Sequence, residues 1–107
     1  MFTLTRIVPV TNELFTTTCE TRIEALAMVR DFFTQNMREA YREWKQDETS
    51  MCISGAEEYL VSRTTEINEM MTCLAEYNYC IDVDVHRIDG SNVDLNIYGI
   101  FAITEKQ

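Results

Sequence analysis

Two segments near the end of the chain alternate apolar and polar residues, which is the pattern of β-strands. They cover residues 79–87 and 93–104 and flank Asp89 and Gly90, a pair typical of tight turns. Strands separated by so short a connection pair with each other in an antiparallel manner. The end of the chain is therefore predicted to be a β-hairpin.

The apolar positions predict how these two strands pair. A connection of three or five residues around Asp89 to Ser91 sets apolar residues against apolar ones, whereas a slip by one residue would set them against charges. One hairpin face is then apolar and the other is polar and acidic. The predicted pairs are Val83–Ile97 and Val85–Leu95 on the apolar face, and Asp82–Tyr98, Asp84–Asn96 and His86–Asp94 on the polar face.

The beginning of the chain has a weaker form of the same pattern. Residues 2–10 alternate, although Arg6 interrupts the apolar side. Pro9 has no N–H to donate, so this strand is expected to end there or to lie at a sheet edge. Residues 14–18 contain three threonines and predict a short second strand.

Two longer segments between these strands have helical periodicity. Thr21 and Glu24 form a capping box for a first helix that is expected to reach Lys45. A second capping box at 54–57 starts a helix that is expected to run from Gly55 to about Tyr77. The expected apolar stripes are Ile23, Leu26, Phe33, Met37, Tyr41 and Trp44 in the first helix, and Ala56, Tyr59, Leu60, Ile67, Met70, Met71, Leu74 and Tyr77 in the second.

Four residues do not fit these stripes. Arg30 and Arg63 fall within them, which is explained either by long side chains that reach water or by ion pairs with carboxylates of the hairpin or the facing helix. Met28 and Phe32 fall on the opposite, polar side of the first helix. They are ordinary exposed residues, residues covered by the first strands, or contacts of a homodimer.

The element order predicts an α+β fold with the order β(β)ααββ. Each helix has one apolar stripe and the hairpin has one apolar face, so the simplest packing sets both helices on one side of an antiparallel sheet. At 107 residues the chain is expected to form a single domain, residues 1–107. The N-terminal strand or hairpin and the C-terminal hairpin would share that sheet.

Charge is distributed unevenly along the chain. Residues 1–46 hold six acids and six bases, whereas residues 47–107 hold twelve acids and three bases and carry the whole net charge of −9. This balance disfavours direct binding to nucleic acid or to an anionic membrane, because both need positive charge. It suits either a basic protein partner or solubility alone.

The sequence contains no motif of a known catalytic or phosphate-binding site. The four cysteines, Cys19, Cys52, Cys73 and Cys80, form no C-x-x-C pair, so free thiols in a reducing cytoplasm are expected rather than disulfides or a zinc site. No apolar run has the length of a membrane span. We therefore expect a cytoplasmic, non-catalytic protein without metal or cofactor.

The acidic residues of the second half form the predicted partner-binding surface. Four glutamates share one flank of the second helix, and the hairpin adds aspartates to its polar face. Side chains two apart on a strand lie almost 7 Å apart and point out in parallel, so alternation alone also explains the aspartates. The predicted set is Glu58, Glu66, Glu69 and Glu76, with Asp82, Asp84 and Asp94.

In size, composition and charge the chain resembles the small inhibitors that phages and mobile elements use against nucleic-acid-handling defence enzymes, of the anti-CRISPR or anti-restriction type. That resemblance implies that the acidic side chains occupy a basic site meant for phosphates. Two other interpretations stay open. One is a structural or regulatory homodimer, and the other is a small-molecule-binding protein or enzyme with a site between sheet and helices that uses Tyr59, Tyr77 or Arg63.

Overall fold

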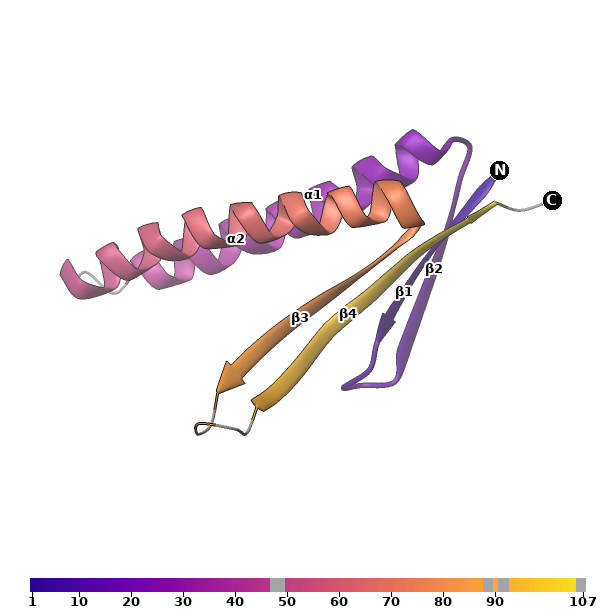
Figure 1. The fold of residues 1–107 in the computed structure, drawn as a ribbon. Coiled ribbons are helices and arrows are strands. Elements are labelled where there is room, and N and C mark those ends of the chain that lie inside the picture. Colours follow the sequence, from indigo (N-terminus) through magenta and orange to yellow (C-terminus); the bar gives the residue numbers. More distant parts are fainter. Residues whose placement is uncertain (47–49, 88–89, 91–92, 106–107) are drawn as a thin grey trace.

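The computed structural model confirms the predicted order of elements. It describes residues 1–46, 50–87, 90 and 93–105, without the side chains of 50–54, 85–87 and 93–94. The elements are strands β1 (Phe2–Val8) and β2 (Glu13–Cys19), helices α1 (Arg22–Lys45) and α2 (Ser50–Tyr77), and strands β3 (Tyr79–Arg87) and β4 (Val93–Glu105) (Figure 1). Residue Pro9 follows the end of β1, as its missing N–H requires.

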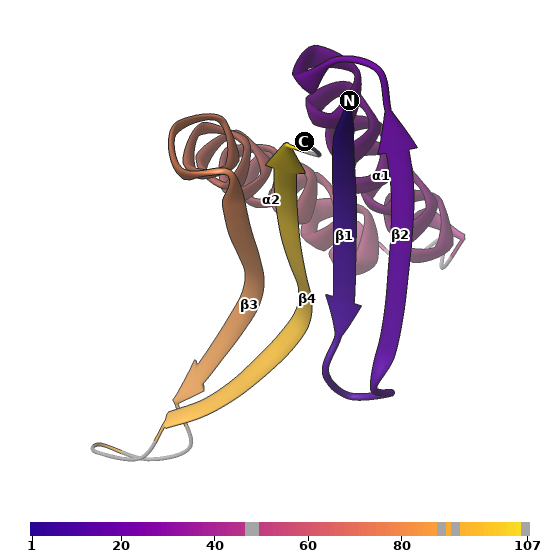
Figure 2. The same cartoon turned by 90° about the vertical axis from the view of Figure 1, so that its right-hand side faces the viewer.

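The four strands form one antiparallel sheet in the order β2-β1-β4-β3. The chain termini therefore lie on the two central strands, and β2 and β3 are the edges. Figure 2 shows both helices behind the sheet, so that only one of its faces is covered. This is the predicted α+β architecture.

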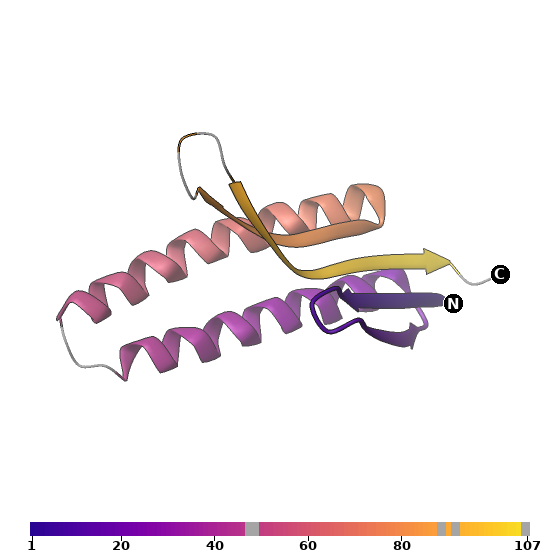
Figure 3. The same cartoon turned by 90° about the horizontal axis from the view of Figure 1, so that it is seen from below.

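The helices extend further than the sheet. Figure 3 shows α1 and α2 lying side by side, with their connected ends beyond the strands. Trp44 and Tyr59 pack against each other near that end, with ring centroids 5.6 Å apart. No helix in the described part of the chain is long and apolar enough to cross a membrane.

The register of the C-terminal hairpin is the predicted one over most of its length. Val83 pairs with Ile97 and Asp84 with Asn96, and the ladder continues to Arg87 and Val93. The connection itself lies mostly outside the described residues. One prediction is wrong: Asp82 pairs with Gly99 rather than Tyr98, because a β-bulge between Asp82 and Val83 leaves Tyr98 as the extra residue.

The hairpin presents the opposite face to the helices from the one expected. Cys80 and Asp82 point inward and are buried, whereas Ile81 and Val83 are 43% and 42% exposed. The reason is strand alternation, because Cys80 pairs with Phe101, which belongs to the core, and every second residue of β3 must follow Cys80. The solvated face predicted for Asp82 is therefore wrong.

Capping residues set the ends of the helices. The Thr21 hydroxyl accepts a hydrogen bond from the Glu24 N–H at 3.2 Å, and the Glu24 carboxylate accepts one from the Glu20 N–H at 3.1 Å. The first of these bonds is the predicted one, whereas the second reaches the residue before the N-cap rather than the Thr21 N–H of a capping box. Helix α2 begins at Ser50, earlier than predicted, and ends at Tyr77; the next residue, Asn78, has a positive φ of 64° and reverses the chain into β3.

The core lies between the helices and the inner face of the sheet. Phe33 and Phe101 meet edge to face at 4.9 Å between ring centroids, and Leu74 is fully buried beside them. The predicted stripes are wrong at their ends, since Ile23 and Tyr77 are 78% and 63% exposed. The buried cluster is Leu4, Cys19, Ala25, Val29, Phe33, Ile67, Met71, Leu74, Cys80, Phe101 and Ile103.

Candidate functional site

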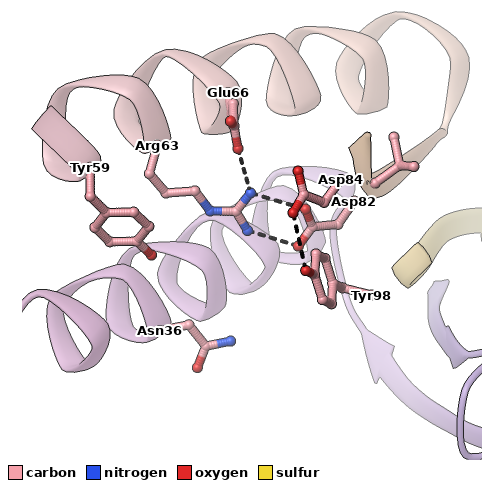
Figure 4. Close-up of a pocket in the computed structure, with 8 residues that line it drawn as sticks. Asn36, Tyr59, Arg63, Glu66, Asp82, Asp84 and Tyr98 are labelled. Carbon is pink, nitrogen blue, oxygen red and sulfur yellow. Dashed lines mark hydrogen bonds and ion pairs between the residues drawn. The ribbon is translucent and has the colours of Figure 1, made fainter. Parts of the chain in front are cut away.

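A groove between helix α2 and edge strand β3 is lined by carboxylates from both elements. Glu66 and Glu69 contribute from the helix and Asp82 and Asp84 from the strand, with Arg63 between them. The groove adjoins a cavity of about 470 Å³ between the helices and the hairpin (Figure 4). That cavity is lined by Asn36, Tyr59, Arg63, Glu66, Asp82, Val83, Asp84 and Tyr98.

Arg63 and Asp82 form a two-pronged ion pair at the base of the groove. The two terminal nitrogens of Arg63 donate to the two carboxylate oxygens of Asp82 at 3.0 and 2.7 Å. One of these nitrogens also donates to Glu66 at 2.9 Å. Hydrogen bonds from Arg63 to Asp82 raise the pKa of the guanidinium above its ordinary value, so it stays charged at any physiological pH.

Elementary geometry brings these groups together. Arg63 and Glu66 lie three residues apart and therefore on the same side of α2. Asp82 faces the helix because it alternates with the buried Cys80. The Arg63 guanidinium also lies over the ring of the buried Phe33, 5.8 Å from its centroid. The ion pair prediction for Arg63 is thus confirmed, and the alternative of a water-reaching side chain is not.

The bulge in β4 places a tyrosine in the site. The Tyr98 hydroxyl donates to Asp84 at 3.3 Å across the two strands of the hairpin. Tyr59 approaches from α2, and burial is the main cause that raises the pKa of its phenol. Both phenols therefore remain protonated hydrogen-bond donors at neutral pH.

The structure brings some of the predicted partner-binding residues together and separates others. All four helix glutamates are exposed, but only Glu66 and Glu69 line the groove with the strand carboxylates. Glu58 and Glu76 lie on the same helix and not in the groove lining. Asp94 pairs with His86 in the strand ladder, as predicted, but its side chain lies outside the described part.

The residues that did not fit the apolar stripes of the helices differ in how far they are buried. Arg30 is exposed, in contrast to Arg63. Phe32 is half-buried: it packs on Phe101 of β4, with 5.7 Å between ring centroids, and Arg6 of β1 lies 4.3 Å from its ring centroid. Met28 is 43% exposed, and its sulfur accepts from the Cys19 thiol at 3.4 Å. The homodimer contact at Met28 and Phe32 stays a prediction.

Sequence reasoning missed three polar residues near these features. Tyr98 and Asn36 line the cavity. Nothing in the sequence indicated the bulge that turns Tyr98 toward the cavity, and no pattern in the sequence marked Asn36 as a site residue. The sequence did mark Arg6 as unusual, because this residue interrupts the apolar side of its strand. Its guanidinium lies between two aromatic rings, 4.3 Å from the centroid of Phe32 and 5.2 Å from that of Phe15.

No family model matches the chain, and neither curated proteins nor solved structures provide a significant match.

The groove offers negative charge and hydrogen-bond donors. Burial raises the pKa of the Cys80 thiol to about 12, so this cysteine is protonated and a poor nucleophile at neutral pH. Among the residues that the structure describes, no three His, Cys, Asp or Glu side chains lie close enough to hold a metal ion. What the arrangement can do is attract cationic groups to a partly enclosed acidic surface.

Proposed function

We propose that the protein is a non-catalytic binding module that acts in the cytoplasm and docks its acidic groove on a basic surface of a protein partner. The observation behind this proposal is the acidic groove between α2 and β3. Residues 55–84, which include both walls, hold seven acids and one base. That base, Arg63, is already paired with Asp82 and Glu66. Acids therefore outnumber bases in this segment, and its excess of negative charge attracts cationic groups.

The partner that suits this surface is one that binds nucleic acid. Lysine and arginine side chains that hold phosphates form a basic surface, and carboxylates presented on a rigid helix and strand compete for the same side chains. An inhibitor of a nucleic-acid-handling defence enzyme would act in this way. The rigid ion pair beneath the groove supports the proposal, since it holds the two carboxylate-bearing elements together before binding.

The test is a pull-down from the native host with two variants of equal charge. The groove-flank variant carries Glu58→Gln, Glu66→Gln, Glu69→Gln and Glu76→Gln. The matched control replaces four exposed glutamates elsewhere, Glu13, Glu20, Glu39 and Glu43, by glutamine. We expect the first variant to lose partner binding at least tenfold and the control to keep it.

Salt and nucleic acid supply a second measurement on the captured complex. Raising the ionic strength from 0.1 to 1 M shortens the Debye length from about 10 to about 3 Å, so affinity should fall steeply. Added nucleic acid should displace the protein from its partner. Equal loss in both glutamine variants, or a complex that is indifferent to salt, would contradict the proposal.

A small-molecule site is the second candidate, because the cavity of about 470 Å³ lies between sheet and helices and is lined by Tyr59 and Arg63. This volume is typical of ligand pockets, which range from about 300 to 1,000 Å³. Tyr77, the third residue expected there, is exposed instead and packs on Tyr79. Native mass spectrometry of protein purified from its host tests this candidate, which predicts a bound small molecule that Tyr59→Ala removes.

A further inference from the structure

The face of the sheet that points away from the helices is uncovered and apolar. Figure 2 views the strands from this side. Strand pairing aligns one residue from each strand into a row across the sheet, because Leu14 pairs with Ile7, Ile7 with Ile100 and Ile100 with Ile81. Three of these four aliphatic side chains are at least 39% exposed. A continuous aliphatic row therefore faces solvent.

The neighbouring rows extend this surface without adding charge. One row runs Thr16, Thr5, Ala102, Tyr79, and the hairpin adds the pair Val83–Ile97 beyond the aliphatic row. No described side chain that points to this face is charged, although a quarter of the chain's residues are. The full set, which we call the outer sheet face, is Thr3, Thr5, Ile7, Leu14, Thr16, Thr18, Tyr79, Ile81, Val83, Leu95, Ile97, Ile100, Ala102 and Thr104.

The outer sheet face reaches the smallest size of a specific protein contact. Four strands spaced about 4.8 Å apart and four rows spaced about 6.8 Å apart cover about 500 Å² in projection. Two copies that meet through this face would cover about 1,000 Å² together, which is the lower bound of specific protein interfaces. Exposed apolar faces of this size on soluble proteins usually mark an interaction site.

The distribution of charge favours a second copy of the chain as the partner at this face. The carboxylates of the acidic groove lie on α2 and on the inner side of β3, so they point away from the outer sheet face, although Ile81 and Val83 of this edge strand line the groove as well. Two copies of a chain with a net charge of −9 repel each other over most of their surfaces, but less so through a face whose described side chains carry no charge. An array of aliphatic residues and threonines can also pack against a second copy of itself, which a two-fold contact requires.

We propose that the protein forms a homodimer in which the outer sheet faces of two copies pack against each other. The two sheets would lie about 10 Å apart with their strands within about 30° of each other, as in β-sandwiches. The row of Leu14, Ile7, Ile100 and Ile81 lies at the centre of the contact. Each acidic groove then points outward, one on either side of the dimer.

Sedimentation equilibrium across protein concentration tests this proposal. The monomer mass is 12.5 kDa, so the dimer mass is about 25 kDa. Ile7→Lys and Ile81→Lys should each weaken dimerisation at least tenfold, because each buries a charge in the apolar contact. Both variants reduce the net negative charge, so relief of general repulsion would act in the opposite direction.

Two further variants separate the interface from folding. Ile23→Lys changes an exposed isoleucine of α1, 78% exposed, and should leave the dimer intact. Ile81→Thr retains strand propensity, and its circular dichroism and melting temperature report whether the fold persists while the dimer weakens. A chain that stays monomeric up to about millimolar concentration, where even weak dimers populate, overturns the proposal. So does a dimer indifferent to both lysine variants, or a monomer that uses this face for another protein.

Discussion

Arg63 and Asp82 share two parallel hydrogen bonds of 3.0 and 2.7 Å, and they join helix α2 to the edge strand β3. Asp82 is the one buried charged residue in the described part of the chain, with 7% exposure. The pair thus compensates for a charge that strand alternation forces inward. It also defines the base of the acidic groove.

Removing one partner of this pair should destabilise the protein strongly. Arg63→Met leaves the Asp82 carboxylate buried without its counter-charge, and we expect the free energy of unfolding to fall by about 3–5 kcal/mol. The double variant Arg63→Met/Asp82→Leu should recover most of that loss, since an apolar pair of similar volume removes both charges. Chemical denaturation of the single and double variants measures both effects.

The exposed Arg30 supplies the control for this prediction. Arg30→Met should change stability by no more than about 0.5 kcal/mol, as surface substitutions usually do. Equal effects at Arg30 and Arg63 would mean that the ion pair contributes nothing beyond the arginine stem.

Gly99 and Gly90 should respond differently to alanine. A Cβ atom on Gly99 would lie 3.2 Å from a ring carbon of Phe101, whereas one on Gly90 meets nothing within 4 Å. We expect Gly99→Ala to cost about 1–2 kcal/mol, because the core ring must shift. Gly90→Ala should leave the free energy of unfolding unchanged or raise it by up to about 1 kcal/mol, because alanine reduces the conformational entropy of the unfolded chain. Thermal melting curves of the two variants test this difference.

The left-handed residue after α2 has both a conformational and a bonding role. Asn78 has a φ of 64°, and its side-chain oxygen accepts from the Arg22 Nε–H at 2.9 Å. Asn78→Ala should lower the free energy of unfolding by about 1–2 kcal/mol through backbone strain alone. Asn78→Gly relieves the strain and should lose only the hydrogen bond, about 1 kcal/mol.

Asn12 serves as a control that separates the effect of backbone strain from the effect of the side-chain hydrogen bond. It has a φ of 57° in the turn between β1 and β2 and no side-chain hydrogen bond in the described structure. Asn12→Ala should therefore cost about as much as strain alone, and Asn12→Gly should cost almost nothing. A similar loss for glycine at both positions in denaturation experiments would exclude a contribution from the bond to Arg22.

Alkaline pH should destabilise the protein through Cys80. Burial raises the pKa of its thiol from 9.0 to about 12, so the folded state holds a proton that the unfolded state releases. The stabilisation is complete below pH 9 and is lost between pH 9 and about 12, with a slope of up to about 1.4 kcal/mol per pH unit. Cys80→Ala should flatten the fall in melting temperature over this range. An unchanged slope would mean that other groups cause it.

Much of the fold could be predicted from the chain alone, because its local signals agree with one another. The alternation of 79–87 and 93–104 predicted both the hairpin and the pairing of Val83 with Ile97. Thr21 and Glu24 predicted the start of α1, and Pro9 predicted the end of β1. These features depend on backbone geometry within a few residues, which the sequence contains.

The candidate site was only partly predictable, because it depends on which sheet face meets the helices. The carboxylates Glu66, Glu69 and Asp84 were expected to bind a partner, and the structure places them in one groove. Asp82 was expected in water and is buried instead. The bulge that brings Tyr98 to Asp84 needs one extra residue in β4, and alternation alone does not reveal where it lies.

By itself, the sequence determined which segments become strands and helices, how the hairpin pairs beyond its bulge, and that the negative charge belongs to the second half. Only the tertiary structure decided which face of each element is buried. A strand has two faces, and packing against Phe33 and Phe101 selected the face with Cys80 and Asp82. That choice leaves an aliphatic row in solvent and turns a surface aspartate into the partner of Arg63.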